Sequence, residues 1–223
     1  MRIGILGCDA IKDELEQITA GDPDVVVREY LEFGLHLHPD DLKKVIVEKL
    51  GTLEGKVDLI FLGYAHCQSL KGIQACCGTP VVMLEHEDCI AAMLSTDRYH
   101  AEKNSGGITW FYPAGWARYG MPGIISLFEL DRVDTGEYPP EYFLRMMFEG
   151  FSRCLFIDTG TGDVPACKCQ SERFARMLDL RHEEARGSLD LMREAWAQVK
   201  ALASEMEVGG VPSGAPERAG TMR

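Results

Sequence analysis

The chain has 223 residues, of which 46% are hydrophobic, and it carries a formal net charge of −12. A chain of this size and composition can bury a full core, and its length fits one large domain better than two. The acidic charge argues against nucleic acids and anionic membranes as partners, because both bind basic patches.

The cellular compartment is predicted to be the cytoplasm. The first residues resemble no signal peptide, and no apolar run approaches the ~20 residues of a membrane helix. In a reducing compartment, the eight cysteines are expected to be thiols or metal ligands rather than disulfides.

Apolar runs alternate with amphipathic stretches along most of the chain. Strands are predicted at residues 2–6, 25–30, 57–62, 81–84, 108–112 and 154–157, and the last helices at 141–151, 171–180 and 182–207. This alternation favours an α/β fold with a doubly wound, mostly parallel sheet, of the Rossmann or flavodoxin type. We expect one domain over residues 1–207 and a disordered Gly/Pro-rich tail over residues 208–223.

Three cysteines stand where predicted strands end: Cys8, Cys67 and Cys89. Open α/β sheets bind ligands outside the carboxyl ends of their strands. In a flavodoxin-like order the three strands are neighbours, so the thiols would fall within about 10 Å of one another. Because thiolates are soft metal ligands, this pattern predicts an iron–sulfur cluster, of the 4Fe-4S type, or alternatively a zinc ion.

The fourth ligand stays open among three residues. His36 follows the second predicted strand, on the other flank of the first, and its imidazole suits a metal. Cys167 and Cys169 follow a Gly-rich loop at the same edge and offer a CxC pair. A free cysteine often only fills space, but three at corresponding strand ends, with a histidine on a fourth strand, favour a site.

Other polar and aromatic residues lie at the same edge. Asp88 is most simply an N-cap, whereas a functional interpretation makes Glu87 or Asp88 a general base. Cys89 would lie in the first turn of a helix, which lowers a thiol pKa. Tyr64 and Trp116 are predicted to line the cofactor site, with simple packing as the alternative for Trp116.

Several short motifs together resemble the DUF1638 family, which has no settled function. They are Leu62-Gly63-Tyr64-Ala65-His66-Cys67, Thr79-Pro80-Val81-Val82, Asp88-Cys89-Ile90, Arg98-Tyr99 and Pro113-Ala114-Gly115-Trp116. The similarity covers most of residues 1–165 and implies cysteines at the positions of Cys8, Cys67 and Cys89. Family members usually carry a histidine directly before the Asp-Cys pair, where this chain has Glu87.

The resemblance also implies an association with corrinoid-dependent methyltransferase systems of anaerobes. A corrinoid protein or a methyltransferase is then the expected partner, although the chain lacks a D-x-H-x-x-G motif for holding cobalamin itself. The leading prediction is a metal-cofactor protein, accessory or catalytic in one-carbon metabolism, with a zinc-thiolate methyltransferase component as its nearest variant.

Two other classes remain open. A cofactor-independent cysteine acid/base enzyme of the racemase type would use Cys8 with Cys67 or Cys89, but the sequence shows no second half that mirrors the first. The other class is a pure interaction module whose acidic surface docks a larger enzyme. Separately, the chain could form a homo-oligomer. The sequence does not decide whether the protein is an enzyme.

Overall fold

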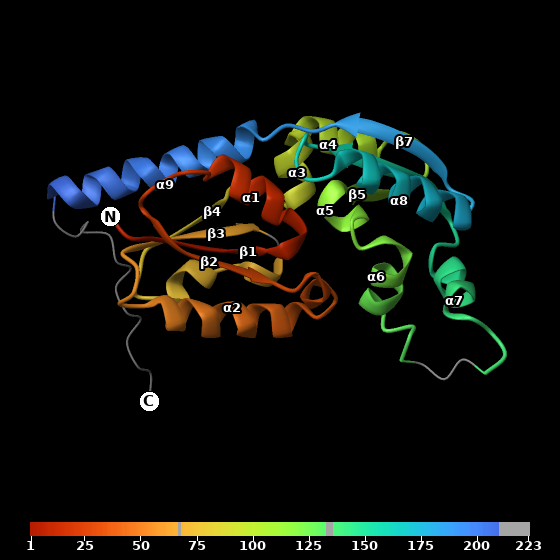
Figure 1. The fold of residues 1–223 in the computed structure, drawn as a ribbon, viewed down its shortest axis with the longest axis horizontal. Helices are drawn as coiled ribbons and strands as arrows, with labels where there is room; N and C mark the ends of the chain where they lie inside the picture. Colours follow the sequence, from red (N-terminus) through yellow and green to blue (C-terminus); the bar gives the residue numbers. More distant parts are fainter. Residues whose placement is uncertain (67, 133–135, 210–223) are drawn as a thin grey trace.

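The computed structural model describes residues 1–66, 68–132 and 136–209, and it contains two parallel β-sheets (Figure 1). The four-stranded sheet has the order β2-β1-β3-β4, and the three-stranded sheet has the order β5-β6-β7. All strand pairs are parallel, and helices flank both sheets. The predicted α/β class with a parallel, doubly wound arrangement is confirmed, and its strands are divided between two sheets.

The first lobe is built by residues 1–94 and 189–209 around β1 (Ile3–Cys8), β2 (Val25–Leu31), β3 (Leu59–Ala65) and β4 (Val81–Leu84). Every residue of β1 and β3 is buried, as expected for central parallel strands. Helix α2 (Pro39–Leu53) covers one face, and α1 (Lys12–Ile18) and α9 (Asp190–Gly209) cover the other (Figure 1).

Helix α1 is held against the first sheet at two glycines. Gly7 of β1 and Gly63 of β3 are partners in the strand register. A Cβ atom at either position would lie 2.4 Å from Cδ1 of Leu15, which is fully buried. Because glycine has no side chain, the helix packs closely on the sheet, and this contact fixes the position of the neighbouring Glu14.

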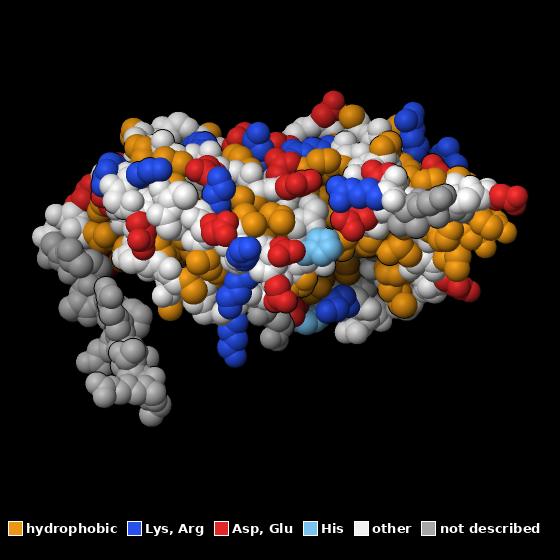
Figure 2. Space-filling view, turned by 90° about the horizontal axis from the view of Figure 1, so that it is seen from below, with side chains coloured by type: hydrophobic (Ala, Val, Ile, Leu, Met, Phe, Trp, Pro, Cys, Tyr) orange, Lys and Arg blue, Asp and Glu red, His pale blue; other side chains and the backbone are white. Residues whose placement is uncertain are grey.

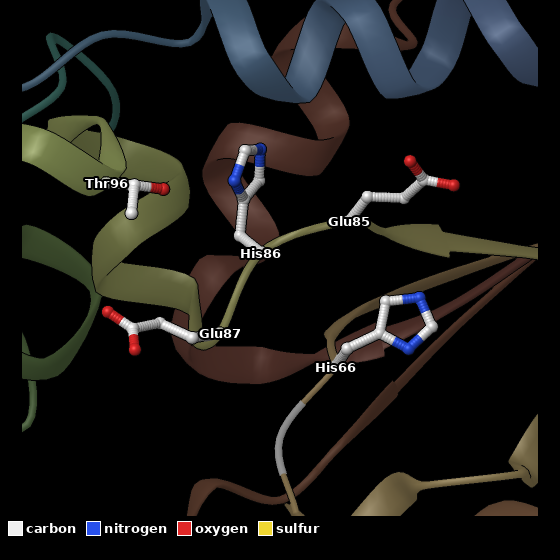
Figure 3. A pocket seen from close by; sticks show the side chains of 5 residues that line it. All are labelled: His66, Glu85, His86, Glu87 and Thr96. Atoms are coloured by element: carbon white, nitrogen blue, oxygen red, sulfur yellow. The ribbon is translucent and has the colours of Figure 1, made fainter.

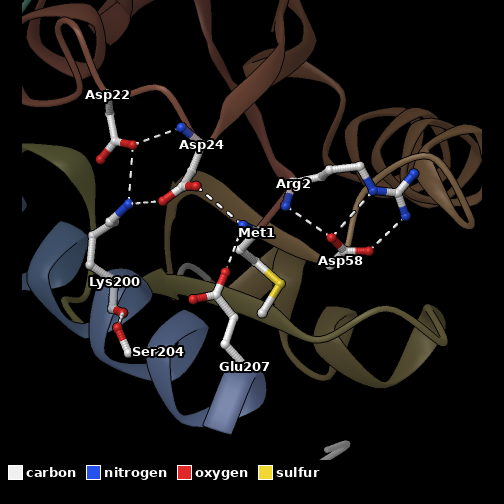
Figure 4. Close-up of polar contacts among 8 residues, drawn as sticks. All are labelled: Met1, Arg2, Asp22, Asp24, Asp58, Lys200, Ser204 and Glu207. Atoms are coloured by element: carbon white, nitrogen blue, oxygen red, sulfur yellow. Dashed lines mark hydrogen bonds and ion pairs between the residues drawn. The ribbon is translucent and has the colours of Figure 1, made fainter.

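Helix α9 ties the end of the described chain to its beginning (Figure 4). Lys200 forms ion pairs with Asp22, at 3.1 Å, and with Asp24. The amino group of Met1 contacts Asp24 at 3.2 Å and Glu207 at 2.7 Å. These bonds hold α9 along the first sheet. The tail was predicted to begin at residue 208, but α9 continues through Val208 to Gly209. Residues 210–223 lie outside the described residues.

The second lobe is built by residues 96–187 around β5 (Ile108–Pro113), β6 (Phe151–Asp158) and β7 (Arg181–Arg186). Its helices are α4 (Thr96–Lys103), α5 (Ala114–Ala117), α6 (Gly120–Leu127), α7 (Pro140–Met147) and α8 (Val164–Met177). A single domain over residues 1–207 stays a prediction.

Strand β7 corrects the predicted helix over residues 182–207. The helix begins only at Asp190, and the residues before it pair in parallel with β6. Their sequence is almost entirely polar, so it carries no strand period. The strand is instead stabilised by pairing and by Arg153, a buried cation of β6 that contacts Glu183 at 2.7 Å.

The carboxyl ends of the two sheets face each other (Figure 1). Gly115 in α5 lies so close to the first lobe that a Cβ atom there would be 1.8 Å from the carbonyl oxygen of Ala10. Two chain crossings join the lobes, at Ser95 and at Gly187–Ser188, and the Ser188 amide donates to the carbonyl of Met93 at 2.8 Å.

No helix among the described residues has the length and apolar character needed to cross a membrane. Acidic and basic side chains are interspersed on the face seen from below, which shows no continuous basic patch (Figure 2).

Candidate functional site

The structure brings Cys8 and His36 into contact. Cys8 ends β1, and His36 lies in a short 3-10 helix, η2 (Phe33–Leu37), that follows the neighbouring strand β2. The sulfur of Cys8 and Nε2 of His36 are 3.1 Å apart. Because β1 and β2 are adjacent and parallel, the segment after β2 lies beside the end of β1, as the sequence predicted.

The surroundings of this pair bury the Cys8 sulfur and leave His36 partly exposed. Cys8 is only 1% exposed, and the rings of Tyr64 and Phe33 lie 5.9 and 6.1 Å from the His36 ring. Burial raises the pKa of Cys8 to about 12, although hydrogen bonds from the Ala10 amide and the Tyr64 hydroxyl oppose the rise. Burial also lowers the pKa of His36.

Both groups are therefore neutral near pH 7. An activated cysteine nucleophile needs the opposite arrangement, in which a nearby cation stabilises a thiolate. The thiol and imidazole of this pair resemble metal ligands more closely than a thiolate–imidazolium dyad.

The distance between the two donor atoms suits a shared metal ion after a small movement. A sulfur and a nitrogen bound to one tetrahedral zinc lie about 3.5 Å apart, which is about 0.5 Å more than the contact seen here. A bound cation would replace the thiol proton. Among the described residues, however, no group of three or more His, Cys, Asp or Glu side chains is arranged to hold a metal. Cys67 lies outside the described residues.

Helix α3 (Cys89–Leu94) places Cys89 and Asp88 at its start. Cys89 is half-buried in the first turn. The Asp88 carboxylate accepts hydrogen bonds from the Ala91 amide at 2.8 Å and from the Tyr99 hydroxyl at 2.6 Å. Its N-cap role is confirmed, and both of its oxygens are occupied by contacts that hold α3 and α4 together.

An open hollow of about 330 Å³ lies at the carboxyl ends of β3 and β4 (Figure 3). It is lined by His66, Glu85, His86, Glu87 and Thr96. Glu87 contacts His100 at 3.1 Å, so its carboxylate faces a histidine on the surface. Sequence reasoning did not single out His66 as a site residue, and its position directly after a buried strand was the available signal.

The remaining predicted site residues lie on the second lobe. Cys167 and Cys169 are both in α8, where residues two positions apart point in different directions. Cys167 is buried and Cys169 is exposed, so the CxC pair does not face one site. Trp116 packs on Phe33 with ring centres 4.7 Å apart, which places it beside the Cys8–His36 pair as part of its apolar cover.

A polar network between the lobes was missed by sequence reasoning. Arg118 contacts the Asp9 carboxylate at 2.9 Å and the Asp13 carboxylate at 3.3 Å, and the Tyr119 hydroxyl donates to Asp9. Buried Glu14 of α1 meets the loop after β6 through a second set of contacts. These groups surround the point where the two carboxyl edges touch.

Comparison with known proteins identifies a family but no activity. A family model described as a protein of unknown function, DUF1638, matches residues 30–196. No curated protein and no solved structure matches the chain. The matched region includes His36, Cys89 and Trp116, whereas Cys8 precedes it. Since the match spans most of the sequence, the chain belongs to the DUF1638 family.

Proposed function

We propose that the protein binds a metal cofactor at the carboxyl edge of its first sheet, with Cys8 and His36 as ligands. Cys89 and Cys67, both from sequence prediction, would supply the further ligands. The cofactor we propose is an iron–sulfur cluster, with zinc as the alternative. The observation that carries this proposal is the 3.1 Å contact between a buried sulfur and an imidazole nitrogen at a strand-end edge.

The donor types support the proposal. Iron–sulfur clusters are held by cysteine thiolates, and histidine replaces cysteine in some of them. Zinc accepts the same donors. When bound, such a group supplies either one-electron transfer or Lewis-acid activation of a thiol. The protein would orient the donors through adjacent strands and exclude water through Phe33, Tyr64 and Trp116.

The biological setting of this proposal is methyl-transfer metabolism. Its support is the resemblance in sequence described above, which implies a corrinoid protein or a methyltransferase as the partner. In that setting, a cluster would pass electrons to the partner, and a zinc-thiolate centre would activate a thiol for methylation.

A racemase-like acid/base enzyme is the second candidate, and one observation favours it. The chain has two lobes whose carboxyl edges meet, with Cys8 on one lobe and Cys167 on the other. The positive charge of Arg118 acts to lower the pKa of both thiols. Burial raises the pKa of each thiol, however, which disfavours the thiolate that proton abstraction requires.

Metal analysis of protein purified without oxygen tests the proposal. The wild type is expected to contain iron and sulfide, with the broad charge-transfer absorption of a thiolate-bound cluster. Cys8→Ser and His36→Gln should lose most of the metal, because each removes one donor of the contacting pair. Cys169→Ser is the matched control, since this exposed thiol lies outside the site, and it should keep the metal.

If the wild type contains zinc and no sulfide, the cofactor is zinc and not an iron–sulfur cluster. Full metal retention in Cys8→Ser and His36→Gln would contradict the proposed ligands. A folded wild-type protein that takes up neither zinc nor a reconstituted cluster would refute the metal proposal and leave the cysteine enzyme.

A further inference from the structure

A buried carboxyl group joins the two lobes. Glu14 in α1 is 1% exposed, and its Oε1 lies 2.7 Å from the Thr159 hydroxyl and 2.8 Å from the Thr161 hydroxyl. Both threonines belong to the loop after β6 in the second lobe. The two threonine hydroxyls also lie 2.9 Å apart, so three oxygens form a closed ring of contacts.

The number of protons in this ring depends on the state of Glu14. Three hydrogen bonds among three oxygens need three protons, and the two hydroxyls supply only two. If Glu14 were a carboxylate, both threonines would donate to it and their mutual contact would have no proton. If Glu14 is a carboxylic acid, its hydroxyl donates to one threonine, that threonine donates to the other, and the other donates back to Oε1 of Glu14. All three contacts are then hydrogen bonds.

The second oxygen of Glu14 supports the neutral form. Oε2 is buried and has no hydrogen-bond partner among the described residues. A buried charge without a partner is costly, whereas the carbonyl oxygen of a neutral acid loses much less. Burial raises the pKa of Glu14, and hydrogen bonds from the two threonine hydroxyls and from the backbone amide of Glu14 itself oppose that rise.

The charged groups around Glu14 favour the same state. The charge of Asp13, on the same helix, raises the pKa of Glu14 further. Cys167 on α8 is close enough that a charge on Glu14 would raise the pKa of its thiol. The cation of the neighbouring network, Arg118, is paired with the carboxylates of Asp13 and Asp9. A negative charge on Glu14 would therefore add to an edge that already carries two carboxylates.

We infer that Glu14 is held as a neutral carboxylic acid and acts as a proton-dependent latch between the two lobes. Loss of the proton breaks one hydrogen bond of the ring and leaves a buried charge at the contact. The lobes then separate about the crossings at Ser95 and Gly187–Ser188. Ser95 has a φ of 73°, which is unusual for a residue other than glycine, so this crossing already holds a strained backbone.

Infrared difference spectra provide the direct test of the protonation state. When the spectrum of Glu14→Gln is subtracted from that of the wild type at pH 7, the difference should show the carbonyl band of a protonated carboxylic acid. Glu16→Gln is the matched control, because Glu16 is an exposed carboxylate on the same helix, and it should leave this band in place. Absence of the acid band in the wild type would overturn the inference.

Site-resolved alkylation measures the opening itself. Cys167 lies at the contact between the lobes and is 6% exposed, whereas Cys154 is fully buried within the second lobe and serves as the internal control. The alkylation rates of the wild type and Glu14→Gln are compared at equal pH across about pH 5 to 9. Gln cannot lose a proton, so the rate in Glu14→Gln serves as the reference. The wild-type rate divided by the Glu14→Gln rate should rise with pH at Cys167, by at most about tenfold per pH unit, and should stay constant at Cys154.

A ratio at Cys167 that does not change with pH would refute the latch. If Glu14→Gln fails to fold, Thr161→Val replaces it, because this variant removes one hydroxyl of the ring. Glu14 should stay protonated in Thr161→Val, and its acid band should shift in frequency because the hydrogen bonding of the acid changes. An acid band at unchanged frequency in Thr161→Val would also count against the ring. The acid band and the Cys167 alkylation ratio are both measured on metal-free protein, so failure of the latch and failure of the proposed metal site are distinguished.

Discussion

The contact between α1 and the first sheet predicts a strong coupling between two substitutions. Gly63→Ala would place a Cβ atom 2.4 Å from Cδ1 of Leu15, which the packed helix accommodates only by shifting. Such overpacking costs about 1–3 kcal/mol of unfolding free energy. Leu15→Ala alone removes a fully buried side chain and should cost about 2–5 kcal/mol.

In the double variant the new methyl group enters the space that Leu15 vacates. The loss of stability should then be smaller than the sum of the single losses by about 1–3 kcal/mol. Urea unfolding of the four proteins measures this difference directly. Gly51→Ala is the control, because a Cβ atom at this exposed helical position meets nothing within 4 Å and should be neutral or stabilising. Losses that add within about 0.5 kcal/mol would show that the helix does not sit on these glycines.

Three further predictions concern caps, buried charge and pH. Asp88→Ala should cost about 1–2 kcal/mol in urea unfolding because α3 loses its cap, and a neutral result would contradict the capping geometry. Arg153→Met should cost about 2 kcal/mol by the same assay, since it removes the buried cation that contacts both Glu102 and Glu183, and added salt should not rescue it. Hydrogen bonds lower the folded-state pKa of Asp24. Its contribution to the free energy of unfolding is therefore fully present above the ordinary carboxyl pKa and is lost as pH falls through the lowered pKa. Acid titration of Asp24→Asn should show a weaker pH dependence than the wild type, and an unchanged profile would contradict this.

Local neighbours in the first sheet were predictable from the sequence. The flavodoxin-like order, with β1 between β2 and β3, follows from buried parallel strands joined by short helical connections. That order also predicted that the segment after β2 would reach the end of β1, which is why Cys8 and His36 meet. The N-cap of α3 was equally readable, since Asp88 directly precedes an apolar helical run.

The contacts between the lobes were not predictable from local patterns. Arg118 and Asp13 are 105 positions apart, and Thr159 is 145 positions from Glu14. Each of these residues is an ordinary polar residue in its own segment, and only the pairing of the two carboxyl edges gives it a partner. Strand β7 was missed for a related reason, because its stability comes from β6 and from Arg153 rather than from its own sequence.

The two proposals meet at the same edge of the molecule. Cys8 is 1% exposed, so a metal or a partner reaches its sulfur only when the cover over it moves. Phe33 belongs to the first lobe and Trp116 to the second, and their rings are 4.7 Å apart, so separating the lobes removes part of that cover. The Glu14 ring lies across the same contact. A proton on one carboxyl group therefore stabilises the closed arrangement that shields the proposed ligands, and its loss favours the open one in which they are accessible.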